Sequence, residues 1–184
     1  MNKRPKRFDP RSKYVRYDKK NGLWITQRKR IYLYWFKFLQ IAEQDPNYKV
    51  DWSKYKGWGG GNYILGTKFD EFWEEKWQSL FGVKVMGGSA KFPLTTDKPK
   101  ADGIRYALLV YENKHRGSNW DIAKWIAKRE TSKRGAGLTN YTFHYALEDG
   151  SEGGDTKLVI QSRVGRYKTA VKKYLRNVCV GQFP

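Results

Sequence analysis

The chain has 184 residues, of which 39% are hydrophobic and 16% aromatic, so it can bury a core and is not disordered throughout. It carries 37 Lys and Arg against 18 Asp and Glu, a formal net charge of +19, which favours a polyanionic partner. One cysteine, Cys179, excludes an intramolecular disulfide and a cysteine-based zinc site, and we expect it to be a small core residue. No apolar run reaches the roughly 18 residues of a membrane span, so we expect no membrane partner.

Residues 1–22 are expected to form a basic, flexible arm. Nine Lys and Arg residues stand there against two Asp residues, and Pro5 and Pro10 prevent an early helix. A like-charge block of this kind stays extended until it meets opposite charge. It also has no apolar region of the kind found in secretory signals. We expect residues 23–184 to form one globular domain, with a linker rich in Gly and aromatic residues at 47–66.

Apolar residues at three- and four-residue spacing predict a helix over 27–43, which Asp45-Pro46 ends. The same spacing predicts a second helix over 68–81. Thr67 is its expected N-cap, and Gly82 stops it.

A loop over 87–103 is expected to lead into an apolar strand over 104–111. A third helix follows over 118–131, where Ser118 and Asp121 have capping-box spacing.

The C-terminal part predicts a hairpin and then a helix. Residues 141–147 are expected to pair with 157–162 across an acidic, Gly-rich turn. The last helix, over 166–180, has one apolar stripe with basic residues largely off it. The predicted fold class is therefore α+β, with about four helices, a small antiparallel sheet and the basic N-terminal arm.

Basic residues outnumber acids most strongly in the arm and in residues 157–176, which contain no acid. A helix whose apolar stripe is buried presents donors along one face, as phosphates require, although such a face can also be merely solvated. Arg163 and Arg166 stand at the expected helix start, where backbone N–H groups also attract anions. The predicted phosphate contacts are Lys3, Arg4, Lys6, Arg7, Arg11, Lys13, Arg16, Arg163, Arg166, Lys168, Lys172, Lys173 and Arg176.

Aromatic residues interleave with lysines in the linker. Tyr55 and Trp58 are candidates for stacking on unpaired bases while Lys54 and Lys56 hold the backbone, and the alternative is that both rings are core.

The helix over 118–131 followed by a hairpin has the order of a recognition helix and a wing. The acidic tip of the hairpin does not suit a wing that contacts phosphate.

Asp102, Glu112 and Lys114 resemble the Asp…Glu-x-Lys signature of the PD-(D/E)XK nuclease family. That resemblance implies that two acids at a strand hold Mg²⁺ while the lysine polarises the attacking water. The match covers about thirteen residues, and Ala101 replaces the usual proline. The alternative is a strand that ends in a charged turn. We expect no cofactor unless the nuclease hypothesis holds.

Two stretches, from Phe69 to Phe81 and from Tyr174 to Pro184, resemble uncharacterised proteins encoded by phages and related mobile elements. This resemblance implies a location in host cytoplasm or in a virion, and it implies no activity. The leading hypothesis is a non-enzymatic protein that binds DNA or RNA. The alternatives are a structural component of a virion or other large assembly, whose arm contacts acidic protein neighbours or the genome, and the Mg²⁺-dependent nuclease.

Overall fold

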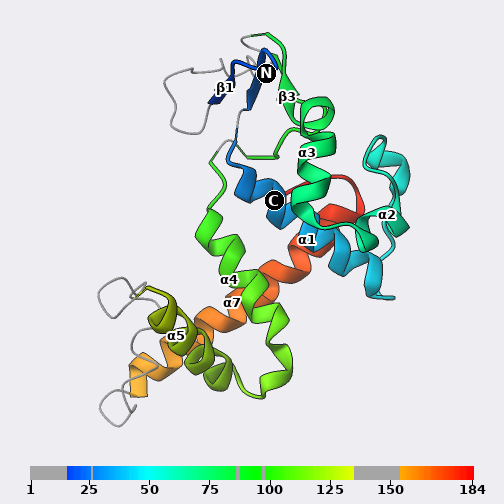
Figure 1. Cartoon of the computed structure of the whole chain (residues 1–184). Helices are drawn as coiled ribbons and strands as arrows, with labels where there is room; N and C mark the ends of the chain where they lie inside the picture. Colours follow the sequence, from blue (N-terminus) through cyan, green and yellow to red (C-terminus); the bar gives the residue numbers. More distant parts are fainter. Residues whose placement is uncertain (1–15, 26, 86–87, 97, 135–153) are drawn as a thin grey trace, which may run out of the picture. The chain divides into compact units, whose positions relative to one another are not determined.

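The computed structural model describes residues 16–25, 27–85, 88–96, 98–134 and 154–184. Over these residues the chain forms six α-helices and a three-stranded antiparallel sheet, so the predicted α+β class is confirmed with more helices than expected (Figure 1). Contacts within the chain divide it into two compact units. The first unit comprises residues 1–101 and 174–184, and the second comprises residues 102–173.

The sheet belongs to the first unit and has the order β1-β2-β3. Its strands are β1 (Arg16–Asp18), β2 (Leu23–Ile25) and β3 (Gly82–Val83). Tyr17 pairs with Trp24 across the hairpin, and their ring centroids lie 4.6 Å apart. A small antiparallel sheet was predicted, but near the C-terminal end of the chain.

The expected arm overlaps this sheet. Residues 16–22 form the first strand and the turn of the hairpin, in which the Asp18 carboxylate accepts hydrogen bonds from the Lys20 N–H and the Asn21 side chain. Residues 1–15 of the expected arm lie outside the described residues.

The two longer helices of the first unit follow the predicted apolar spacing, whereas α2 (Gly61–Gly66) lies in the segment expected to be a linker. Half of the sixteen residues of the first helix are buried, because its apolar residues occupy most of its circumference. The helix predicted over 68–81 has Lys68 as its N-cap rather than Thr67. The Lys68 N–H donates to the Glu71 carboxylate at 3.4 Å. The elements are α1 (Lys29–Gln44), a 3₁₀ turn (Trp52–Tyr55), α2 (Gly61–Gly66) and α3 (Phe69–Leu80).

The core of the first unit is built on aromatic rings around Trp35, which is fully buried. Its indole N–H donates to the Tyr55 hydroxyl at 3.1 Å, and that hydroxyl donates to the Val178 carbonyl at 2.5 Å. Burial raises the pKa of Tyr55. The Phe183 ring stacks on Trp35 at 5.8 Å, so residues far apart in sequence close one core.

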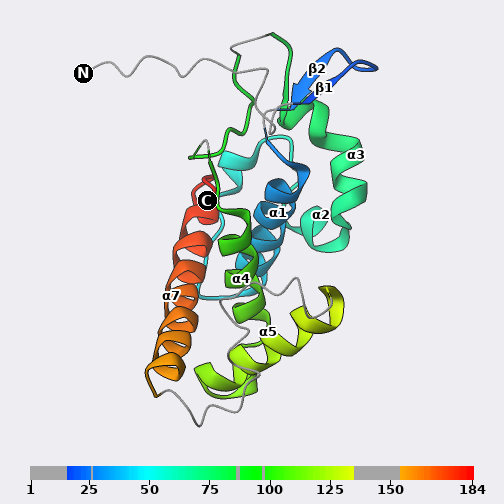
Figure 2. The same cartoon turned by 90° about the vertical axis from the view of Figure 1, so that its left-hand side faces the viewer.

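The second unit contains three long helices and a 3₁₀ turn (Figure 2). They are α4 (Ala101–Glu112), the turn Lys114–Arg116, α5 (Asn119–Arg134) and α7 (Gly154–Cys179), which continues into the last residues of the first unit.

The prediction of a strand over 104–111 is wrong, because this segment lies within α4. Ile104 and the five residues from Tyr106 to Val110 are all buried. A short, continuous apolar run fits a buried strand and a buried helix equally well, so its periodicity could not decide between them.

The prediction of a strand over 157–162 is also wrong, since α7 begins at Gly154, twelve residues before the expected start at 166. Ile160 and Val164 lie four residues apart on one face and are buried, as helical packing requires. The partner strand expected at 141–147 lies outside the described residues.

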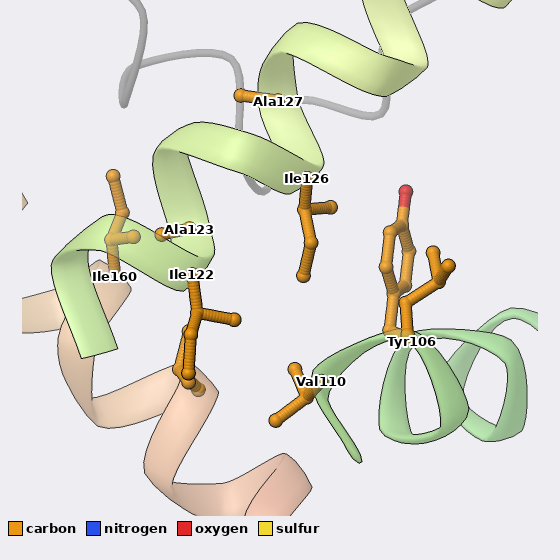
Figure 3. Packing of buried hydrophobic residues seen from close by; sticks show 9 residues of the cluster. Tyr106, Val110, Ile122, Ala123, Ile126, Ala127 and Ile160 are labelled. Atoms are coloured by element: carbon orange, nitrogen blue, oxygen red, sulfur yellow. The ribbon is translucent and has the colours of Figure 1, made fainter. Parts of the chain in front are cut away.

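Nine buried side chains from the three helices form the core of the second unit. Figure 3 shows Ile122 and Ile126 of α5 facing Val110 and Tyr106 of α4, with Ile160 of α7 beside α5. The nine residues are Tyr106, Leu109, Val110, Ile122, Ala123, Ile126, Ala127, Ile160 and Val164.

The capping box predicted at the start of α5 is confirmed. The Ser118 hydroxyl donates to the Asp121 carboxylate at 2.6 Å and accepts from the Asp121 N–H at 3.2 Å. The Ser118 N–H donates to the same carboxylate at 3.1 Å. These hydrogen bonds, of which the one from the Ser118 side chain has the largest effect, lower the pKa of Asp121.

Replacing Ser118 with alanine is expected to lower the free energy of unfolding by about 1 kcal/mol, because one N–H of the first turn loses its acceptor. Urea unfolding followed by circular dichroism measures this loss. Ser79→Ala is the matched control, since Ser79 is exposed within α3 and caps no helix. Equal losses in the two variants would show that the hydroxyl at Ser118 does not act as a cap.

Candidate nucleic-acid interface

The basic residues predicted in the C-terminal segment lie on α7, outside its buried stripe. Val164 and Val171 are turned into the core, while Arg166, Lys172 and Lys173 are exposed. Arg163 and Lys168 are half-buried, and Arg176 is exposed. The predicted arrangement, an apolar stripe with basic residues off it, is confirmed for this helix.

The charges of this basic face are not neutralised locally. No acidic residue occurs from Thr156 to the end of the chain. Among the residues that the structure describes, none of the six basic side chains from Arg163 to Arg176 forms an ion pair. The face from Arg163 to Lys173 rises about 15 Å along the helix. Phosphates of one B-DNA strand repeat at about 3.4 Å along the duplex axis, so this length matches about four of them.

A shallow groove of about 600 Å³ lies in the second unit beside this face. Gly165, which has no side chain, and the exposed Arg166 both line it. The Asn119 side-chain amide ties α5 to α7 by donating to the Gln161 carbonyl at 3.2 Å. Hydroxyl and amide groups can donate hydrogen bonds to phosphate oxygens. The lining residues are Asn119, Leu158, Gln161, Ser162, Gly165, Arg166 and Thr169.

The predicted placement of Arg163 and Arg166 at a helix start is wrong. Both lie well inside α7, because the helix begins at Gly154. Interior N–H groups of a helix are bonded to carbonyls one turn back, so they are not available to anions. These two residues therefore offer only their side chains. Nearby, burial raises the pKa of Tyr167, and the positive charge of Arg163 opposes that change.

The arm contributes one described residue to the predicted contacts. Arg16 is exposed on β1, close in sequence to the exposed Lys19 and Lys20 of the hairpin turn. The other predicted arm contacts lie outside the described residues; they are Lys3, Arg4, Lys6, Arg7, Arg11 and Lys13.

Base stacking on Tyr55 and Trp58 is not possible in this structure. Their exposed fractions are 2% and 0%, since both rings pack in the aromatic core of the first unit. Gly59 and Gly60 have φ values of +98° and +85°, which side chains other than glycine rarely adopt, and so they allow the sharp turn after Trp58. The glycines of the expected linker therefore shape a folded segment.

The nuclease-like residues do not have the arrangement that their resemblance implies. Asp102 lies in the first turn of α4 and Glu112 at its end, about 15 Å apart along the axis. Ligands of one Mg²⁺ ion bind it at about 2.1 Å, so these two carboxylates are too far apart on this helix to share the ion. Lys114 lies in the following turn, with its ammonium group 4.1 Å from the centroid of the Tyr111 ring. Within the described residues, no group of three His, Cys, Asp or Glu side chains is placed to hold a metal ion.

The predicted wing lacks its second strand, because residues 157–162 are helical. The arrangement of a recognition helix followed by a two-stranded wing is therefore not formed.

None of the described helices has an apolar stretch long enough to cross a bilayer.

One group of residues was missed by the sequence analysis. The guanidinium carbons of Arg116 and Arg129 lie 4.6 and 5.1 Å from the centroid of the half-buried Trp125 ring. Arg129 is four residues after Trp125 on α5, a spacing that the sequence shows. Arg116 reaches the same ring from the preceding turn, and no local pattern indicates that contact.

The chain matches no protein-family model, no curated protein and no solved structure. Geometry and charge are therefore the basis for assigning a function, and the resemblance to phage proteins stays a prediction.

Proposed function

We propose that this chain is a non-enzymatic nucleic-acid-binding protein, encoded by a phage or mobile element, that contacts phosphates through α7 and its N-terminal arm. The observation that carries the proposal is the basic face of α7. Within the described residues its six Lys and Arg side chains form no ion pair, and no acid occurs after Asp155. Unpaired like charges repel each other and destabilise the folded state, so a bound polyanion relieves that cost.

The groove beside the basic face has groups that can bind a phosphate. Arg166 lines this groove beside Gly165, against which the Asn119 side-chain amide lies. A guanidinium group can bind phosphate oxygens with two parallel hydrogen bonds. Ser162 adds a hydroxyl group along the groove, whereas the Thr169 hydroxyl donates to the Gly165 carbonyl at 3.3 Å.

A second candidate is a structural role in a virion or other large assembly. The observation that favours it is the acidic surface of α3, where Asp70, Glu71, Glu74 and Glu75 are all exposed. Lys29 pairs with Asp70 at 2.7 Å and with Glu74 at 3.9 Å, and Lys76 pairs with Glu75, so two lysines offset about half of the charge of these four acids. A basic arm of a neighbouring copy would find opposite charge on this surface.

The variant Arg166→Gln, Lys172→Gln, Lys173→Gln tests the proposal. We expect its Kd for nucleic acid at about 0.1 M salt to rise by about 10²–10³-fold, because three phosphate contacts and their counterion release are lost. Fluorescence anisotropy with a labelled 20-nucleotide strand and with its duplex measures the change.

The matched control is Lys84→Gln, Lys98→Gln, Lys100→Gln, which removes the same charge from exposed positions of the first unit. This control is expected to lose much less affinity. Equal losses in both variants would mean that α7 is not the contact surface. Absence of binding by the unaltered protein at about 50 mM salt would overturn the proposed function itself.

A further inference from the structure

Arg116 is an exposed side chain that is held in one position. Free arginine side chains sample many rotamers, and fixing one costs about 2 kcal/mol. Here the Arg116 Nε donates to the Asn113 Oδ1 at 2.7 Å, and its guanidinium carbon lies 4.6 Å from the Trp125 ring centroid. The ordering cost is therefore already met before any ligand arrives.

Asn113 is what makes this arrangement rigid. Its exposed fraction is 4%, and it is the one polar or charged residue among the buried side chains of the described residues. Its side-chain N–H donates to the Leu109 carbonyl of α4 at 2.8 Å, which directs its oxygen toward Arg116. The Arg116 N–H also donates to the Asn113 carbonyl at 3.0 Å, so the backbone of the turn supports the side-chain contact.

The fixed guanidinium group keeps most of its binding capacity. In the part of the chain that the structure describes, the two Nη groups of Arg116 donate no hydrogen bond. Guanidinium groups stack on aromatic rings and on nucleobases, and they also bind phosphate. Arg116 is thus placed to accept a planar, electron-rich partner.

Arg129 brings a second positive charge to the same ring, with its guanidinium carbon 5.1 Å from the Trp125 centroid. Since both groups lie over one ring, their charges are no more than about 10 Å apart and repel each other. Over the described side chains, neither arginine forms an ion pair with a carboxylate. Asp121, the acid nearest in sequence to Arg116 on α5, is engaged by Ser118 and by Lys124, whose ammonium group lies 3.6 Å from it.

We infer that Arg116, Trp125 and Arg129 form a binding site for an unpaired nucleotide, so that the protein prefers single-stranded to double-stranded nucleic acid. The base stacks against the Arg116–Trp125 pair, and its phosphate lies near the two positive charges. In a duplex each base is stacked between its neighbours and paired with its partner, so it cannot reach this site. The inference rests on the proposed function, because it names which form of nucleic acid binds.

The test compares a 20-nucleotide oligothymidine strand, an abasic strand of the same length and a 20-base-pair duplex, with the full chain at about 0.1 M salt. Arg116→Lys keeps the charge and removes the planar group. We expect it to weaken binding to oligothymidine by about 5- to 150-fold, the range measured for loss of one stacked base. Binding to the duplex and to the abasic strand is expected to change by less than about threefold, since the phosphate contacts remain.

Arg28→Lys is the control, since Arg28 is exposed in the first unit and belongs neither to α7, nor to the arm, nor to the nucleotide site. Its Kd for oligothymidine should stay within about twofold of the unaltered protein. Equal loss on all three ligands in Arg116→Lys would overturn the nucleotide site and leave the proposed function standing. Absence of binding to any of the three ligands by the unaltered protein would instead overturn the proposed function, and the nucleotide site with it.

Discussion

Raising the salt concentration from about 50 to about 200 mM is expected to weaken nucleic-acid binding by on the order of 10³-fold. Each phosphate neutralised by Lys or Arg releases about 0.9 counterions from duplex DNA, so affinity falls steeply as salt rises. The six basic side chains of α7 from Arg163 to Arg176 alone give a slope of log K against log salt near about −5. The slope is measured by anisotropy at five or more salt concentrations.

Two comparisons make this expectation specific. Sucrose at matched osmolality changes water activity without adding ions, so it should leave the affinity nearly unchanged. The variant Arg166→Gln, Lys172→Gln, Lys173→Gln should reduce the magnitude of the slope by about 2.7, since three contacts are removed. A slope near zero in the unaltered protein would contradict phosphate binding through α7.

Helices α1 and α3 of the first unit could be predicted because their apolar residues repeat with helical spacing. Ile31, Trp35 and Phe38 are separated by three and four residues, and all three are buried in α1. The segment from Ile104 to Tyr111 has no helical spacing of apolar and polar residues, since nearly every residue in it is apolar. Without polar positions to mark an outer face, its spacing could not distinguish a helix from a strand.

The start of α7 could not be predicted because its local signal favours the wrong structure. Leu158, Val159 and Ile160 form a short apolar run of the kind common in strands. In the structure Leu158 and Val159 are 64% and 51% exposed, and only Ile160 enters the core of the second unit. Packing against α4 and α5 decides the conformation here, and such contacts are not visible in a local pattern.

The two parts of the candidate site differ in how far the sequence predicts them. The charge of α7 follows from composition, since a run without acids stays basic in any fold. The Arg116 site depends on burial of Asn113 and on a contact nine residues along the chain, to Trp125. The prediction that Tyr55 stacks on unpaired bases is wrong, because the Gly-rich segment around it folds into the core.

Truncating Trp35 to alanine is expected to lower the free energy of unfolding by about 3–5 kcal/mol. The indole is fully buried. Its ring centroid lies 5.5 Å from that of Trp58 and 5.8 Å from that of Phe183. Its removal leaves a cavity between rigid rings, which cannot collapse to fill it. It also removes the N–H that donates to the Tyr55 hydroxyl. The loss is measured by urea unfolding followed by near-ultraviolet circular dichroism.

Trp24→Ala is the matched control, because Trp24 is half-buried on β2 and packs against the exposed Tyr17 at the sheet edge. Its loss is expected to be less than half that of Trp35→Ala, since solvent already reaches part of the ring and the surrounding chain can close over the gap. Total stabilities of small proteins are about 5–15 kcal/mol, so the Trp35 variant should unfold at much lower urea while the control shifts modestly. Equal shifts in the two variants would contradict the assignment of Trp35 as the centre of this core.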